Sequence, residues 1–393
     1  MAILSTLLFG LAAAGLLILF AGAVLLARHA GEKDPAPTRY PGISVLKPLC
    51  GADDDLEANL ASFAALGWPE YEVLLGIPDP ADAALPVART AAARWPGRFR
   101  IVFQRGAPGL NPKVNQLVTL ARAARHDVFV VSDSNVRVPH DYLAGIAAHL
   151  EDPGVGLVTH LVTGSGERSL GALLDALHLA GGVAPGVAAA KRLLGHDIVV
   201  GKSMAFRRAD LERLGGFAAA KDVLAEDYVL GRWVSQRLGK RVALAHAPIV
   251  NTMQQRPVGE FVARYRRWAV LQRRIGGAPL HAAQLVLNPV ALAAGAAALQ
   301  PGRGAFALLG AICGARAALD GACARRLRLG GFTWRQLLAV PLKDLLFASA
   351  WAHGLVSQDV VWRGKRLRVL EGTRLARAEL ADDGAPAVTA EAA

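Results

Sequence analysis

The chain has 393 residues, more than one ordinary domain needs, and 53% of them are hydrophobic whereas 19% are charged. A mean hydropathy of +0.31 is too high for a typical soluble enzyme and predicts membrane segments. The formal net charge of +12 suits nucleic acid or an anionic membrane surface, and the apolar segments favour the membrane, so no nucleic-acid partner is expected.

The first predicted element is a membrane helix at the N-terminus. Residues Ala2 to Ala27 carry no charge, and a run of about 26 residues is long enough to cross ~30 Å of hydrocarbon. It is too long for a cleaved signal peptide and lacks the basic start of one, so residues 1–27 are expected to remain as an anchor. Arg28, His29 and Lys33 follow, and the positive-inside rule then places the next segment in the cytoplasm.

Residues 40–275 predict a cytosolic α/β domain in which strands and helices alternate. The expected strands are Ile43–Leu49, Tyr71–Ile77, Phe99–Phe103 and Val128–Val131, and the expected helices are Leu56–Leu66, Ala84–Trp95 and Lys113–Ala124. This order is typical of an open, mostly parallel sheet with helices on both faces, which binds ligands at the carboxyl ends of its strands. No glycine-rich dinucleotide motif or phosphate loop is present, which argues against a dehydrogenase or an ATPase.

Two of these strand ends carry acidic residues. Asp79 follows the second strand, where a carboxylate can accept hydrogen bonds from a base or a ribose. Asp133 follows the fourth strand with Asn135 two residues later, so both oxygen-bearing side chains can face one site. Hard divalent cations such as Mg²⁺ prefer oxygen ligands and share them with substrate phosphates. Taken alone, each acid is better explained by an ordinary turn.

Lys113 and the pair Glu226-Asp227 are further candidates. Lys113 opens a helix capped by Asn111, a place where the helix dipole disfavours a cation unless that cation meets an anion. Two adjacent carboxylates can have different roles, one acting as a base while the other stabilises the start of the helix. The plain alternatives are a solvated lysine and helix-start acids that match the dipole.

A denser motif lies at Arg264-Tyr265-Arg266-Arg267-Trp268. Arg264 and Arg267 are three residues apart and share one helix face, so they can present two guanidinium groups to a diphosphate, with Trp268 as an apolar wall. The alternative is a juxtamembrane basic patch, because the next apolar segment begins at Pro279.

Residues 279–357 predict further membrane segments. Pro279–Leu299 and Ala305–Leu319 are expected to form a helical hairpin, after which a basic run at 325–328 returns the chain to the cytoplasm. Leu337–Val356 is interrupted by Pro341 and by charged residues, which leaves spanning, re-entrant and interfacial placements open. Residues 381–393 are expected to be disordered.

The order of these candidates resembles a known family pattern. Asp79, Asp133 and Asp227, followed by Arg264, Arg267 and Trp268, resemble the D, D, D, (Q/R)xxRW pattern of membrane-bound inverting glycosyltransferases with the GT-A fold. Several stretches are similar to the ceramide glucosyltransferase branch: Ser44–Leu49, Asn111–Asn115, Ser132–Val138, Gly201–Met204 and Leu224–Tyr228. The resemblance covers about residues 40–275 and implies a GT-A domain with membrane helices on either side.

The resemblance also implies a reaction and a role for each candidate. The donor would be a UDP-sugar, in the first instance UDP-glucose, and the acceptor a lipid, in the first instance ceramide, at the cytoplasmic side of the inner membrane. One inverting displacement would turn the α-linked donor into a β-glucosyl lipid. The implied roles are uridine binding by Asp79, Mg²⁺ or Mn²⁺ binding by Asp133 with Asn135, general-base catalysis by Asp227, diphosphate binding by Arg264 and Arg267, and an acceptor wall at Trp268, with Lys113 and Glu226 also expected to bind substrate.

Three alternatives stay open. Hopanoid glycosyltransferases are similar and would transfer N-acetylglucosamine from its UDP donor to a hopanoid polyol. A processive polysaccharide synthase is disfavoured by two to four expected spans. A non-enzymatic membrane protein is disfavoured because every position of the pattern is filled. One departure remains: Asn135 stands where many such enzymes have a second acid, which leaves the ligand set of the metal open.

Overall fold

The computed structural model of the chain describes residues 1–362 and 365–377; the tail 381–393, for which disorder is predicted, lies outside the described residues. The α-helices are α1 (Ala2–Gly31), α2 (Leu56–Ala64), α3 (Ala84–Arg94), α4 (Pro112–Ala123), α5 (Tyr142–Leu150), α6 (Leu170–His178), α7 (Ala184–Leu194), α8 (Arg208–Arg213), α9 (Glu226–Leu238), α10 (Val258–Ala283), α11 (Pro289–Leu299), α12 (Arg303–Leu327), α13 (Trp334–Leu337) and α14 (Val340–Val356). A π-helix, η1 (Leu179–Val183), joins α6 to α7, and η2 (Phe217–Ala220), η3 (Gln284–Leu287) and η4 (Glu371–Thr373) are 3₁₀-helices. The strands are β1 (Ile43–Pro48), β2 (Tyr71–Ile77), β3 (Phe99–Phe103), β4 (Val128–Ser132), β5 (Val136–Arg137), β6 (Val155–Ser165), β7 (Ser203–Arg207), β8 (Arg241–Thr252), β9 (Asp359–Trp362), β10 (Lys365–Val369) and β11 (Leu375–Arg377).

The main sheet has the strand order β3-β2-β1-β4-β7-β6-β8-β5. The four strands predicted from the sequence are confirmed, and they are parallel to one another, so their carboxyl ends meet at one edge. The prediction lacks strands β5 to β8, and among these β7 is antiparallel to both β4 and β6. Its residues Ser203–Arg207 contain no long apolar run, and a mixed sheet is the result.

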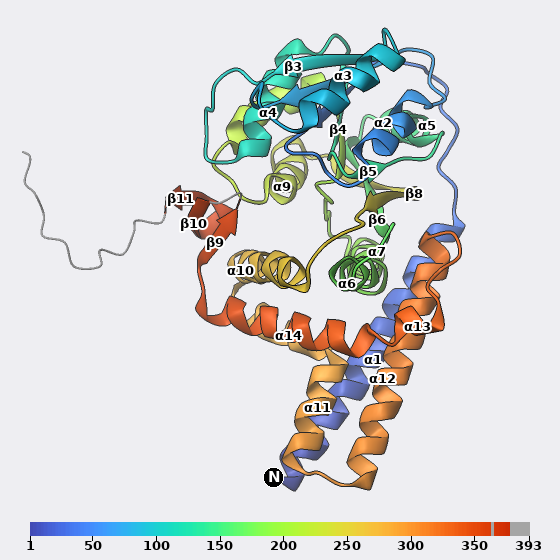
Figure 1. The fold of residues 1–393 in the computed structure, drawn as a ribbon, viewed down its shortest axis with the longest axis vertical. Helices are drawn as coiled ribbons and strands as arrows, with labels where there is room; N and C mark the ends of the chain where they lie inside the picture. The colour runs from blue at the N-terminus through green and yellow to red at the C-terminus, as the bar shows by residue number, and fades with distance from the viewer. Residues whose placement is uncertain (363–364, 378–393) are drawn as a thin grey trace, which may run out of the picture.

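Alternating side chains of the central strands fill two cores, one on each face of the sheet. Ile43 and Val45 of β1 belong to the core shared with α2, α3 and α5, whereas Leu46 belongs to the core shared with α4 and α9. Val130 and Val131 of β4 divide between the two faces in the same way. Helices therefore cover both faces, and the strand ends are the place left for a site (Figure 1).

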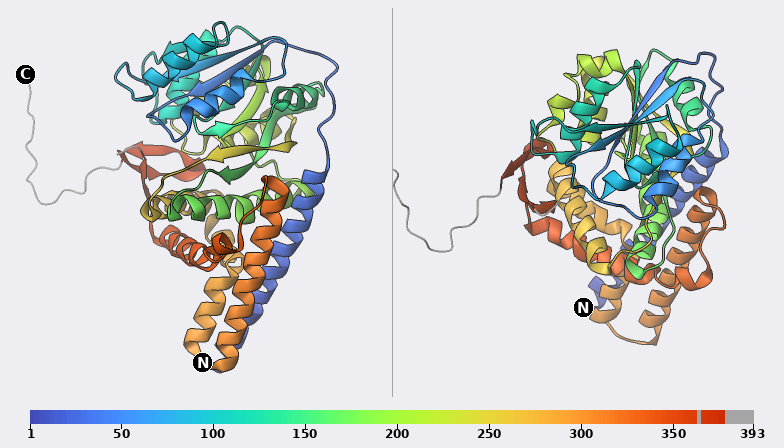
Figure 2. Two further views of the ribbon diagram at one scale, coloured as in Figure 1. Left: turned by 45° about the vertical axis from the view of Figure 1, so that its right-hand side comes forward. Right: turned by 45° about the horizontal axis from the view of Figure 1, so that its top comes forward.

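A bundle of α1, α11 and α12 projects from the α/β domain (Figures 1 and 2). Of the described helices, Ala2–Gly31 and Arg303–Leu327 are long and apolar enough to cross a membrane, and α10–η3 with α11 form a further candidate bent by 79°. The continuous segment Leu170–Leu194 also passes by composition, but its apolar window is 72% buried, against 17% for α1, so it is a core helix under the sheet.

The predicted hairpin exists, but its first limb is shorter than Pro279–Leu299. Helix α10 runs on to Ala283 with a break at Gly277, where φ is +73°, and α11 begins only at Pro289. Asn288 before this proline has a non-helical backbone, as residues before proline tend to have, so a new helix must start there.

Helix α14 corresponds to the stretch whose placement the sequence left open. It lies across the head of the bundle and packs along α10, so it is not a fourth member of the bundle (Figure 1). Its two charged residues, Lys343 and Asp344, point inward and are buried. Lys343 pairs with Asp320 of α12, and Asp344 Oδ2 accepts from Arg316 Nε of the same helix at 3.1 Å. The charges that interrupt the apolar stretch thus join α14 to α12.

A small antiparallel sheet, ordered β11-β10-β9, closes the described chain beside α10 (Figure 2). The end of η4 and the start of β11 hold the loop that precedes α9 through two backbone hydrogen bonds. Leu224 N donates to Thr373 O at 2.8 Å, and Leu375 N donates to Asp222 O at 2.7 Å. The start of α9 is therefore fixed from the C-terminal end of the chain.

Candidate active site

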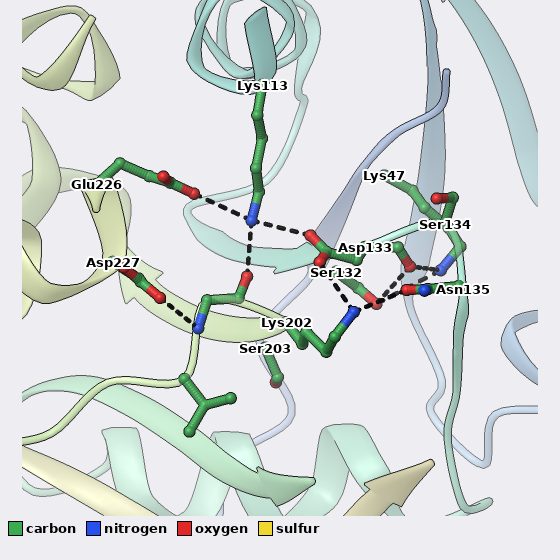
Figure 3. Close-up of polar contacts among 12 residues, drawn as sticks. Lys47, Lys113, Ser132, Asp133, Ser134, Asn135, Lys202, Ser203, Glu226 and Asp227 are labelled. Atoms are coloured by element: carbon green, nitrogen blue, oxygen red, sulfur yellow. Dashed lines mark hydrogen bonds and ion pairs between the residues drawn. The ribbon is translucent and has the colours of Figure 1, made fainter. Parts of the chain in front are cut away.

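Charged side chains from four segments meet at the carboxyl edge of the sheet (Figure 3). The turn between β4 and β5 brings Asp133 and Asn135, the start of α4 brings Lys113, and the start of α9 brings Glu226 and Asp227. Strand pairing adds a lysine that sequence reasoning did not select. Because Ser132 pairs with Ser203 in the antiparallel β4–β7 ladder, Lys202 lies next to Asp133.

Lys113 is the centre of this cluster. Its ammonium lies 2.8 Å from Asp133 Oδ1 and 3.0 Å from Glu226 Oε1, and it donates to Gly201 O at 2.8 Å. All three of its N–H groups therefore have acceptors. Burial opposes the charged form, but Asp133 and Glu226 raise the pKa of Lys113 above its ordinary value. The anions that Lys113 meets are two carboxylates of the protein itself.

Asp133 and Asn135 share a second cation, the ammonium of Lys202. Lys202 Nζ lies 3.3 Å from Asp133 Oδ2 and 2.8 Å from Asn135 Oδ1. Burial alone would raise the pKa of Asp133, but Lys113 and Lys202 hold it well below its ordinary value. Burial lowers the pKa of Lys202 to about 8, against the pull of Asp133. The two oxygens converge on one positive charge, and hard oxygen donors of this kind fit a divalent cation such as Mg²⁺ or Mn²⁺.

Lys47 is the second lysine that sequence reasoning passed over. It lies in β1 with no exposed surface and donates to the backbone oxygen of Asp133 at 2.6 Å. Its ammonium also lies over the ring of Phe63, 4.0 Å from the centroid. Burial lowers the pKa of Lys47 to about 7. The available signal was a lysine within a strand that is otherwise buried and apolar.

Asp227 lies at the head of α9, on the other side of Gly201 from Lys113 (Figure 3). Gly201 N donates to Asp227 Oδ2 and Tyr228 N donates to Oδ1, both at 2.8 Å. A side chain at Gly201 would place a Cβ 2.5 Å from that Oδ2, so only glycine permits this approach. Burial first, and the adjacent charge of Glu226 second, raise the pKa of Asp227 to about 6. A half-buried carboxylate with this pKa is a suitable proton acceptor near neutral pH.

Asn111 connects the two helix starts. Its side-chain oxygen caps α4 by accepting from Lys113 N and Val114 N at 3.0 and 3.1 Å. Its amide nitrogen donates to Val223 O at 2.7 Å and to Glu226 Oε2 at 3.2 Å. The loop before α9 is thus held by Asn111 on one side and by the C-terminal sheet on the other, which fixes Lys113 and Asp227 relative to each other.

The arginine motif lies on α10, next to the α6 segment under the sheet. Arg264 Nη1 pairs with the buried Asp175 Oδ2 at 2.7 Å, and Tyr265 donates to the other oxygen at 2.8 Å. Trp268 packs edge-on against Tyr265. Arg267 has no carboxylate partner among the residues the structure describes, so its guanidinium is available for an anion. Asp175 was missed in the sequence, where an acid within the apolar run 170–180 was the signal.

Asp79 lies apart from this cluster. It is exposed after the end of β2, and its Oδ1 accepts from Ala81 N at 2.7 Å, as in an ordinary Asx turn. The next acid, Asp82, accepts from Gly51 N of the loop after β1 at 2.9 Å. The loops after β1 and β2 are thereby joined at the same edge of the sheet as Asp133.

The chain matches one family model, described as Glycosyl transferase family 21, over residues 7–375. Two of the curated relatives are ceramide glucosyltransferases of Caenorhabditis elegans. Ceramide glucosyltransferase 1 is 33% identical over 132 residues, which are 33% of this chain and 28% of that protein. Ceramide glucosyltransferase 3 is 26% identical over 235 residues, 59% of this chain and 50% of that protein. The matches thus span half or less of these relatives.

Among solved structures, a mannosyltransferase of Pyrobaculum calidifontis in complex with GDP-Man and Mn²⁺ has a similar fold. The TM-score is 0.56 at 23% sequence identity, with 89% of this chain and 99% of that chain covered. The family match and this similarity confirm the predicted GT-A architecture, and the structure itself contains the predicted apolar N-terminal helix, Ala2–Gly31.

Proposed function

Because the chain belongs to glycosyl transferase family 21, we propose that it transfers glucose from UDP-glucose to a hydroxyl group of a membrane lipid with inversion at the anomeric carbon. The proposed acceptor is ceramide, in keeping with the names of the relatives, and the product is a β-glucosyl lipid. The observation that carries the proposal is that a carboxylate suited to act as a base lies close to a lysine suited to bind an anion. At the sheet edge, Gly201 contacts both groups: its N–H donates to Asp227, and its carbonyl oxygen accepts from Lys113, which pairs with Asp133.

In the proposed reaction Asp227 removes the proton of the acceptor hydroxyl. The acceptor oxygen then forms a bond to the anomeric carbon on the face opposite the leaving UDP, whose bond to that carbon breaks. One displacement of this kind inverts the centre. Glu226 cannot replace Asp227 as the base, because its carboxylate is buried and engaged by Lys113 and Asn111.

Negative charge that develops on UDP needs cations on the donor side. Lys113 and Lys202 supply them beside Asp133, and we assign Arg264 and Arg267 to the same diphosphate and Trp268 to the acceptor wall. Asp133 and Asn135 would hold Mg²⁺ or Mn²⁺, which when bound neutralises phosphate charge. Asp79, at the end of β2, is assigned to the uridine.

The basic residues around the bundle support a domain that faces the cytoplasm. Arg325, Arg326 and Arg335 are exposed near the end of α12 and in α13, whereas the opposite end of α12 begins with the single basic residue Arg303. By the positive-inside rule, the proposed location is the inner membrane with the α/β domain on its cytoplasmic side. Residues 1–27, 40–275 and 279–357 are then the anchor, the transferase domain and the C-terminal membrane segments.

This orientation gives a first prediction. Alkaline phosphatase, which is active only outside the cytoplasm, is expected to be active when fused after Gly302 and inactive when fused after Gly97 in the α/β domain. Enzyme activity and fusion protein level in intact cells are measured together. The reverse pattern would contradict the proposed orientation.

The pKa of Asp227 gives a second prediction. The base must be ionised, and burial with the charge of Glu226 raises its pKa to about 6. The rate constant kcat is therefore expected to rise about tenfold between pH 5 and pH 7 and then to level off. A profile measured at saturating substrates tests this, with stability at each pH checked by incubation and return to pH 7. A flat profile over this range would exclude Asp227 as the titrating base.

The proposed function is tested by transfer assays on membranes that contain the chain. UDP-glucose and UDP-N-acetylglucosamine are each supplied with ceramide or with a hopanoid polyol, and lipid products are identified by mass. Transfer of glucose to ceramide is the expected result. Transfer only from UDP-N-acetylglucosamine to the polyol would move the proposal to the hopanoid reaction, and no lipid product at all would refute it. Chelation of divalent cations in the same assay is expected to stop turnover.

A further inference from the structure

We propose that Lys202 is a resident counter-cation of this site, which keeps divalent metal from Asp133 and Asn135 until a nucleotide diphosphate is present. The inference rests on the proposed function and adds an order of binding to it: metal and diphosphate bind together, and the metal does not bind first.

Each side-chain oxygen that Asp133 and Asn135 could offer to a metal already faces a lysine ammonium. Asp133 Oδ1 faces Lys113 Nζ at 2.8 Å, and Asp133 Oδ2 faces Lys202 Nζ at 3.3 Å. The remaining side-chain oxygen, Asn135 Oδ1, accepts from the same Lys202 ammonium at 2.8 Å. A divalent ion bonded to these oxygens at about 2.0 to 2.2 Å would lie against that ammonium. Repulsion between like charges in a half-buried site opposes this strongly.

The charge balance points the same way. Asp133 supplies the single carboxylate of the proposed metal ligands, because Asn135 is neutral, and Lys202 already compensates it together with Lys113, which Asp133 shares with Glu226. A nucleotide diphosphate brings several negative charges. It can pair with a displaced ammonium and also supply phosphate oxygens to the metal. Only with that ligand does the site hold enough negative charge for a divalent cation.

Lys202, and not Lys113, is the side chain that can move away from the proposed metal ligands. The Lys113 ammonium has three acceptors from three different elements, and all of its N–H groups are used. Lys202 has two acceptors, and both are the proposed metal ligands. Its backbone is fixed by the hydrogen bond from Asp133 N to Lys202 O at 3.4 Å, but its four-carbon side chain can rotate toward a phosphate.

Binding of Mn²⁺ to the purified full chain tests the proposal without turnover. Free Mn²⁺ is measured by electron paramagnetic resonance during titration, with and without UDP. The wild-type chain is expected to bind Mn²⁺ tightly only with UDP. Lys202→Met, which keeps the length of the side chain and removes its charge, is expected to bind Mn²⁺ without UDP at least about tenfold more tightly than the wild type, or about 1.4 kcal/mol.

Two controls locate the effect. Adding Asp133→Asn to Lys202→Met is expected to abolish the gain, whereas Lys33→Met, at an exposed lysine after α1, is expected to change nothing. Circular dichroism and gel filtration check that each variant is folded. If Lys202→Met does not fold, Lys202→Gln, which also removes the charge, is measured in its place.

Equal Mn²⁺ affinity with and without UDP in the wild type, or equal affinity of wild type and Lys202→Met without UDP, would overturn the inference and leave the proposed function intact. Absence of Mn²⁺ binding in every variant, even with UDP, would overturn the inference together with the proposed metal. The expected Mn²⁺ behaviour in a chain that transfers no sugar to lipid would support the inference and refute the function.

Discussion

Replacement of Asp227 by asparagine is expected to lower kcat by about a thousandfold while the KM for the sugar donor stays near the wild-type value. The amide keeps the size of the carboxylate and an oxygen that can accept from Gly201 N, so the fold around it should persist. What the substitution removes is the proposed ability of Asp227 to take a proton from the acceptor hydroxyl. Initial rates at saturating donor and lipid, measured from pH 5 to pH 8, test this expectation.

The pH profile separates catalysis from structure in this experiment. The residual activity of Asp227→Asn should no longer rise through pH 6, because the group that titrates there is gone. Asp227→Glu, which moves a carboxylate of the same charge, should recover part of the rate. Glu212→Gln, an exposed acid of α8, is the matched control and should behave as the wild type. Full activity of Asp227→Asn would show that another group is the base.

Replacement of Asp320 by asparagine is expected to destabilise the chain by about 3 to 5 kcal/mol, the usual cost of breaking a buried ion pair. Asp320 has no exposed surface and pairs with both Lys343 and Arg316. Arg316 also donates to Gly181 O at 3.2 Å, which ties the π-helix η1 to α12. Without the Asp320 charge, Lys343 and Arg316 are left with Asp344 alone. Denaturant unfolding of detergent-solubilised protein measures the loss.

An exposed pair provides the comparison. Arg94 and Glu57 lie 3.3 Å apart with side chains about three-fifths exposed, so Glu57→Gln should cost no more than about 1 kcal/mol. A combined Asp320→Leu and Lys343→Met variant removes one negative and one positive charge and leaves Arg316 paired with Asp344, so it should recover much of the stability that Asp320→Asn loses. Equal stability of Asp320→Asn and the wild type would mean that the network does not hold α14 to α12.

The sequence predicted those helices and strands whose formation depends on neighbouring residues in the chain. The strand Val128–Ser132 follows from an apolar run, the start of α4 from Asn111 and Pro112, and helix α1 from an uncharged stretch of membrane length. The same signals placed Asp133 at a strand end. They cannot say which distant residues neighbour it.

The residues that were missed are those that tertiary structure brings in. Lys202 reaches Asp133 because β7 pairs with β4 in the antiparallel sense, although 69 positions separate the two in the chain. Asp175 meets Arg264 across two helices, 89 positions apart. These long separations follow neither the helical nor the strand periodicity, so they cannot be recognised in the sequence. A sequence pattern of acids and arginines can therefore indicate a reaction, but it does not identify the oppositely charged residues that pair with them.

The sheet β9–β11 has a consequence for the synthesis of the protein. Thr373 and Leu375 hold the loop of Asp222 and Leu224, yet these strands are translated long after α9 has left the ribosome. A nascent chain can thus enter the membrane and form most of its sheet while Asp227, the proposed base, is still loosely held. We expect catalytic competence to arise only when translation is nearly complete, so that prematurely ended chains stay in the membrane without consuming donor sugar.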